Sequence, residues 1–256
     1  MMTVTSNAFH AYLANLTATL ISHYTPPNTG VGYDYNHIYE MLMWGPKIKA
    51  LEPYRHLDLN EFVIAVWLHN TDRPALLKKE IGFVADRRMS AGEFATVWAA
   101  YLHKLLVDSP FDEATRDRIV DAVIQHPKKF DEPGDSVLLT TLRIADKIVR
   151  FGPLGMIGQP ANNRGHMFYD PKKPFGFGST RESDLQTVYD DFMRVLEWYG
   201  ILPSDEARSL VPISWIKAVL AFLRVMGEQI AMYTGKENLI ELDLKKALGA
   251  YYEKFA

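Results

Sequence analysis

Apolar residues recur along most of the chain at spacings of three and four, which places them on one face of an α-helix. The first example lies within residues 5–23, where the shared face carries Phe9, Leu13, Leu16 and Leu20. A loop rich in proline and glycine, TPPNTGVGYD, follows. This pattern predicts an amphipathic helix at the start of the chain.

The next two segments predict helices with identifiable ends. Asn36 is a plausible N-cap for HIYEMLMWGPKIKAL, in which Pro46 marks an end or a kink. Asp58 or Asn60 can cap the segment EFVIAVWLHN. This second segment is apolar nearly all round, so we expect it to be central and buried.

The remaining patterns are also helical. Residues 91–107 and 112–126 are amphipathic, and residues 136–151 carry an apolar stripe. Helical patterns resume within 182–256, and no alternation of strands and helices is visible. The predicted fold class is therefore all-α.

The segment between residues 151 and 180 differs from its surroundings, because it holds ten glycines and prolines. Its aromatic residues argue against disorder: Phe168, Tyr169, Phe175 and Phe177. We expect a lid or a packed Ω-loop. This loop is assigned to a domain of residues 1–181, with the helices of 182–256 packed on it as one structural unit.

Composition narrows the class of protein. The 256 residues are 48% apolar and 23% charged, as in an ordinary globular protein. The net charge of -3 gives no reason to expect a nucleic acid polymer or a membrane surface as a partner. There are no cysteines, so any metal must be held by imidazole, carboxylate, amide oxygen or water.

Two segments bear on the location of the protein, and two tryptophans bear on its assembly. The start, MMTVTSNAFHAYL, lacks the regions of a signal peptide, and the apolar stretch VPISWIKAVLAFLRVMGEQIAM is interrupted by Lys217, Arg224 and Glu228. We therefore expect a cytoplasmic protein. A homo-oligomer stays open, since Trp198 and Trp215 suit either an interface or a core.

Three histidines and one carboxylate stand where helices begin, end or are buried. His37 opens a predicted helix, His69 and His126 each end one, and Asp146 lies in the apolar stretch TLRIADKIV. Burying a carboxylate without a partner is costly, and a cation would remove that cost. Imidazole and carboxylate together suit Mn, Fe, Co, Ni or Zn, with Mg as a further option.

The order of these residues resembles the HD-domain metal-dependent phosphohydrolases. The resemblance covers roughly residues 30–151 and is carried by GYDYNHIYEML, AVWLHN and RIADKI. It implies a helical bundle of HD-domain type with a metal at its centre. His37, His69 and Asp146 match the first, second and last ligand of the family pattern.

The chain departs from this family at one ligand, because the family's Asp after the second His is Asn70 here. An amide oxygen can ligate a metal, but it brings no negative charge. Asp72, three residues after His69, would share its face on a continuing helix. We expect Asp72 to approach the metal or to act as the general base, with Arg73 neutralising phosphate charge.

Further roles follow for nearby basic residues. His126 could contact the phosphate or donate a proton to the leaving group, and Lys128 and Lys147 could bind the substrate. His103 is the other candidate for an additional ligand, but its position within a helix favours a structural role. One metal is therefore expected rather than two.

Each of these residues also has a purely structural interpretation. His69 could be a core histidine satisfied by a backbone carbonyl, and Asn70 a helix C-cap in the left-handed conformation. Asp146 could pair with Arg143 or Arg150 on its own helix.

Four functions therefore remain open. The resemblance implies hydrolysis of a small phosphorylated substrate, such as a nucleotide, by water activated at the metal. A degenerate member would bind a ligand or a metal without turnover. The same scaffold also carries di-iron oxygenases, which need more ligands than can be assigned here. A purely structural helical interaction protein is the last alternative.

Overall fold

The computed structural model describes residues 6–22, 24–25, 34–72, 91–128, 130–152, 154–156, 158, 166–178 and 187–256. Their regular structure is helical, and an isolated bridge joins Met167 to Thr187. The all-α class predicted from the sequence is confirmed for this part of the chain.

The chain divides into two compact units, Met1–Ala145 and Asp146–Ala256. The division falls within one continuous helix, α7 (Val137–Ile148). It differs from the boundary expected after residue 181, since the glycine- and proline-rich segment 151–180 falls in the second unit.

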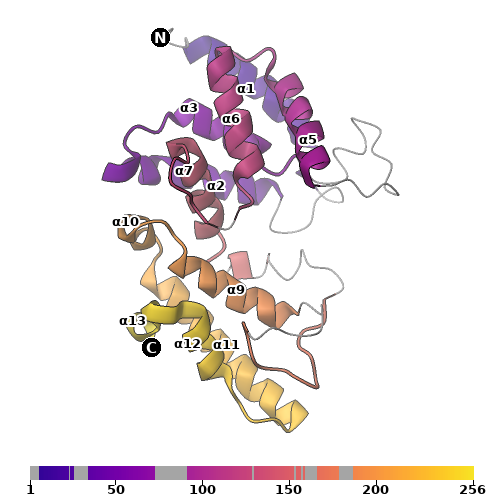
Figure 1. Ribbon diagram of the computed structural model, residues 1–256, viewed down its shortest axis with the longest axis vertical. Coiled ribbons are helices and arrows are strands. Elements are labelled where there is room, and N and C mark those ends of the chain that lie inside the picture. The colour runs from indigo at the N-terminus through magenta and orange to yellow at the C-terminus, as the bar shows by residue number, and fades with distance from the viewer. Residues whose placement is uncertain are drawn as a thin grey trace. The chain divides into compact units, whose positions relative to one another are not determined.

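The first unit is a set of helices drawn from indigo to magenta in Figure 1. In chain order they are α1 (Ser6–Leu20), α2 (Tyr35–Lys49), the short 3-10 helix η1 (Glu52–Tyr54), α3 (Leu59–Leu68), α5 (Ala91–Leu106), α6 (Glu113–Gln125) and the start of α7.

Helix α3 is the centre of this unit. It contacts α1, α2 and α6, and its residues from Ile64 to Leu68 are all buried. Asp58 caps it by accepting hydrogen bonds from the backbone N–H groups of Asn60 and Glu61. The central, buried helix predicted from AVWLHN is therefore present, with Asp58 as its cap.

The ends of helix α2 differ from expectation. Its N-cap is Asp34, whose Oδ1 accepts from the N–H groups of Asn36 and His37, so the prediction of Asn36 as the cap was wrong. A carboxylate two residues before Asn36 satisfies the same exposed donors and is favoured by the helix dipole. The helix continues through Pro46 to Lys49 instead of ending there.

Helices α2 and α3 approach closely at one glycine. A Cβ atom on Gly45 would lie 2.6 Å from Cε1 of Phe62, whose side chain is buried. The hydrogen on the Gly45 Cα thus leaves room for the aromatic ring of α3. This close approach lets the C-terminal part of α2 pack against the N-terminal part of α3.

The second unit is helical as well and is drawn from orange to yellow in Figure 1. It holds α9 (Val188–Gly200), α10 (Asp205–Ser209), α11 (Ile213–Thr234), α12 (Ile240–Leu248), the 3-10 helix η2 (Gly249–Tyr251) and α13 (Tyr252–Phe255). Helices α9 and α12 pack together in its core.

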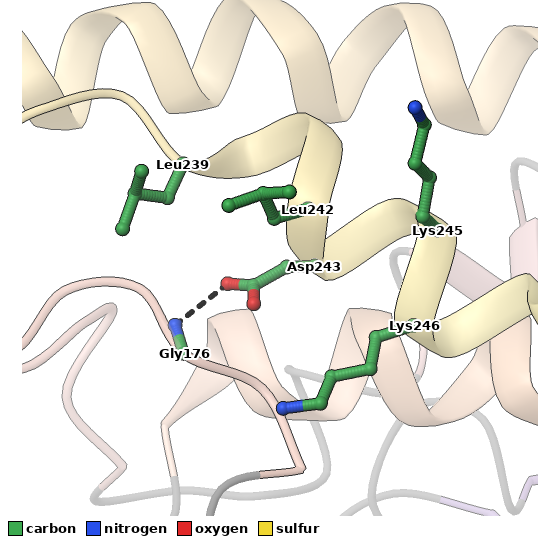
Figure 2. A pocket seen from close by; sticks show the side chains of 6 residues that line it. All are labelled: Gly176, Leu239, Leu242, Asp243, Lys245 and Lys246. Atoms are coloured by element: carbon green, nitrogen blue, oxygen red, sulfur yellow. Dashed lines mark hydrogen bonds between the residues drawn. The ribbon is translucent and has the colours of Figure 1, made fainter.

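A buried carboxylate of α12 holds the described part of the long loop. Asp243 accepts hydrogen bonds from the N–H groups of Gly176 and Phe177, and from the hydroxyl of Tyr189 on α9. Figure 2 shows the Asp243 side chain directed at Gly176, beside a pocket that Leu239 and Leu242 also line. Residues 166–178 are thus packed on the helices of their own unit.

None of the helices in the described ranges is long and apolar enough to cross a membrane.

We expect Gly45→Ala to destabilise the first unit by about 1–3 kcal/mol, because the added methyl group overlaps the ring of Phe62. Urea unfolding followed by circular dichroism measures the change. Gly92→Ala in α5 is the matched control, since its Cβ would meet no atom within 4 Å. Equal stabilities of the two variants would contradict the proposed close packing.

Candidate metal centre

Three of the residues singled out from the sequence converge in the structure. His37, His69 and Asp146 each offer one ligand atom, and these atoms all lie within 4.8 Å of one another. His37 is in the first turn of α2, His69 follows the last residue of α3, and Asp146 is in the last turn of α7. Both imidazoles are buried, and the Asp146 side chain is 23% exposed.

The orientation of His69 is fixed by the end of its own helix. Its Nδ1 lies 2.6 Å from the carbonyl oxygen of Val66. A carbonyl only accepts hydrogen bonds, so Nδ1 carries the hydrogen, and in the neutral ring Nε2 carries the lone pair. This is the tautomer in which Nε2 can ligate a metal, with a second-shell oxygen holding the ring.

Two donors are directed at the lone pair of His69. The Nε2 atom of His37 lies 3.2 Å from Nε2 of His69, and the amide nitrogen of Asn70 lies 2.8 Å from it. Because His69 Nε2 accepts, His37 Nε2 donates in this arrangement. A cation bound by His69 Nε2 would have to replace these two hydrogens.

The predicted alternative for Asn70 as a left-handed C-cap was wrong. No described residue other than glycine has a positive φ, and the C-cap position of α3 belongs to His69 in right-handed geometry. The Asn70 side chain is buried and directed at His69 instead. Its amide nitrogen thus donates to His69 within the site instead of capping the helix through its backbone geometry.

Asp146 also makes the ion pair that sequence reasoning offered as the alternative to metal ligation. Its Oδ1 accepts from Nη2 of Arg150 at 3.0 Å, and the Arg150 guanidinium lies 5.6 Å from the ring centre of Trp198. The ion pair and the position near the histidines occur together, because a carboxylate has two oxygens. Arg143 is not this partner.

These donors suit a transition metal. Two imidazole nitrogens and a carboxylate oxygen form a set common for Zn, Mn, Fe, Co and Ni, and less typical of Ca or Mg. The fixed tautomer of His69 and the hydrogen-bonded carboxylate of Asp146 are the supports that such ligands usually have. The residues present therefore fit a divalent metal.

His126 lies beside this group without being part of it. Its ring centre is 5.3 Å from that of His69, at an angle of 81° between the planes. Like His69 it follows a helix, α6, and its Nδ1 lies 2.6 Å from a carbonyl three residues earlier, that of Val123. Its Nε2 is therefore the nitrogen that can exchange a proton with a ligand.

The other predicted site residues are distributed more widely. Asp72 is half-buried and is not part of the group within 4.8 Å, and Arg73 lies outside the described residues. Lys147 is buried, whereas Lys128 is exposed and donates to Gln125. His103 is half-exposed, with Nδ1 3.9 Å from a carboxylate oxygen of Asp117.

Sequence reasoning missed the residue that holds the connection after His126. Arg143 of α7 is 2% exposed, and its Nη1 donates to Asp131 at 3.0 Å and to Asp135 at 2.6 Å, while Nη2 donates to the carbonyl of Gln125 at 2.9 Å. The bond from the Glu132 N–H and the Arg143 guanidinium hold the pKa of Asp135 below its usual range. Arg143 thus fixes the end of α6 to α7.

No family model and no curated protein matches this chain. Among solved structures, it resembles a crystal structure of a protein from Lactobacillus plantarum, determined as a Northeast Structural Genomics target. The TM-score is 0.61 with 16% sequence identity, over 92% of this chain and 100% of the other. At this identity the likeness concerns the fold alone.

We expect Arg143→Met to destabilise the first unit by about 3 kcal/mol at neutral pH, because two carboxylates lose their cation in a buried site. Arg55→Met, which removes an exposed ion pair with Glu52, should cost at most about 0.5 kcal/mol. Urea midpoints of both variants and the wild type measure the differences.

The Arg143 contribution should depend on pH. A lowered carboxyl pKa adds stability above the pKa of the unfolded chain and loses it as the pH falls through the folded value. The difference between wild type and Arg143→Met should therefore shrink below about pH 4. A difference that stays constant from pH 7 to pH 3 would contradict this assignment.

Proposed function

We propose that this protein is a metal-dependent phosphohydrolase of HD-domain type, acting on a small phosphorylated substrate such as a nucleotide. The observation that carries the proposal is the convergence of His37, His69 and Asp146 within 4.8 Å. These residues come from three helices separated along the chain, and they are the ones that match the ligands of the HD pattern.

The chemistry of the donors supports this reaction class. When bound, a divalent cation would supply a Lewis acid that activates water and neutralises phosphate charge. His69, held by the carbonyl of Val66, and His37 beside it would bind this cation together with Asp146. Asn70 would ligate through its amide oxygen after a rotation of the side-chain amide that exchanges the positions of its oxygen and nitrogen.

The surrounding residues would serve the substrate. In its protonated form, the imidazolium, His126 would give the Nε2 proton to the leaving group and become neutral, since its Nδ1–H is engaged by the carbonyl of Val123. Lys128 and Lys147 would neutralise phosphate charge, with Arg73 as a further cation. Asp72 would act as the general base.

A second candidate function is binding of a metal or ligand without turnover. One observation favours it: the Asn70 amide donates to the same His69 lone pair that a metal needs. A site in this condition has one carboxylate where the HD pattern has two. Metal content and activity separate the two candidates.

The test is elemental analysis of the purified protein, followed by assays of phosphate release from p-nitrophenyl phosphate and nucleoside monophosphates with Mn, Co, Ni or Mg added. We expect a single metal and measurable hydrolysis in the wild type. His37→Ala and His69→Ala should each weaken metal binding by at least about tenfold and abolish hydrolysis.

His103→Ala is the control, because this half-exposed histidine lies outside the group and should leave both readouts unchanged. A protein that neither binds metal nor releases phosphate would refute the proposal. Metal bound through His69 without any hydrolysis would favour the second candidate instead.

A further inference from the structure

We infer that this centre binds its cation together with a dianionic phosphate group, so that its substrates are phosphate monoesters rather than diesters. The inference rests on the proposed metal site. It follows from the net charge of the side chains in that site. Asn70 is neutral where the HD pattern has a carboxylate, and Arg150 adds a positive charge.

The ligand set carries a single negative charge. His37 and His69 are neutral imidazoles when they ligate, Asn70 is an amide, and Asp146 is the one carboxylate among them. His37, His69 and Asn70 are all buried. Salt screens charges in such a buried site less than charges at the surface, so the imbalance of charge persists at ordinary ionic strength.

The charge of Asp146 is already shared with a neighbouring cation. The Arg150 guanidinium donates to its Oδ1 at 3.0 Å, and Arg150 is itself 6% exposed. Its guanidinium carbon also lies 5.6 Å from the ring centre of Trp198, within the range of a cation–π contact. A divalent cation, one carboxylate and one guanidinium together leave two positive charges in excess.

A dianion cancels this excess, whereas a monoanion cancels half of it. A terminal phosphate monoester carries two negative charges near neutral pH, and a phosphodiester carries one. The cation alone should therefore bind weakly, and cation and dianion should strengthen each other. By linkage, the factor by which phosphate strengthens metal binding equals the factor by which metal strengthens phosphate binding.

The experiment measures Mn²⁺ affinity from the loss of the aqueous Mn²⁺ resonance signal, with and without inorganic phosphate at pH 8. For the wild type we expect phosphate to strengthen Mn²⁺ binding at least about fivefold. Phenyl phosphate should act likewise, and dimethyl phosphate should have little effect.

Asn70→Asp is the decisive variant, since it adds one negative charge with almost no change of shape. It should bind Mn²⁺ more tightly than the wild type without phosphate and show a smaller strengthening with phosphate. Asn15→Asp, on the exposed face of α1, adds the same charge away from the site and should behave like the wild type. Circular dichroism checks that each variant is folded.

The outcomes separate this inference from the proposed function. If wild type and Asn70→Asp bind no Mn²⁺ with or without phosphate, the metal site itself is refuted. If Mn²⁺ binds through His69 but phosphate does not strengthen it, or strengthens it equally in Asn70→Asp, the inference on charge is overturned and the metal site stands. Equal effects of phenyl phosphate and dimethyl phosphate would overturn the preference for monoesters.

Discussion

The candidate site depends on one hydrogen bond, from Nδ1 of His69 to the carbonyl of Val66. The last carbonyls of a helix have no partner within the helix, and a donor placed just after it satisfies one of them. Here that donor is an imidazole, so capping the buried end of α3 also directs the Nε2 lone pair toward His37. The hydrogen bond to Val66 therefore serves both interpretations of His69. It satisfies the end of α3, and it orients the imidazole ring for metal binding.

The same arrangement, an imidazole that follows a helix and donates to one of its last carbonyls, occurs a second time at His126. Its Nδ1 approaches the carbonyl of Val123 at the same distance and the same sequence separation, and its ring stands beside that of His69. Both rings are placed by helix ends, and α3 packs against α6. Rigid helices, rather than loops, thus hold both imidazoles, which limits how far either can shift when a ligand arrives.

Much of the fold follows from local patterns in the sequence. Periodicity of apolar residues predicted the helices, and the polar residues before an apolar run limited the cap of α3 to Asp58 or Asn60, of which Asp58 is the cap. The same rule failed at Asn36, where Asp34 two residues earlier is the cap, because several polar residues stand in a row and the pattern does not choose between them. Caps are local interactions, so sequence predicts them to within a residue or two.

The sequence by itself determined which residue types could form a site, His37, His69 and Asp146, and in which order they occur. Only the tertiary structure decided that they meet, since periodicity defines the apolar face of a helix but not the helix it packs against. The contact of Gly45 with Phe62 illustrates this, because it depends on the distance between two helices. The ion-pair partner of Asp146 also depends on the tertiary structure. Arg143 donates to other carboxylates, and Arg150 is the arginine that donates to Asp146.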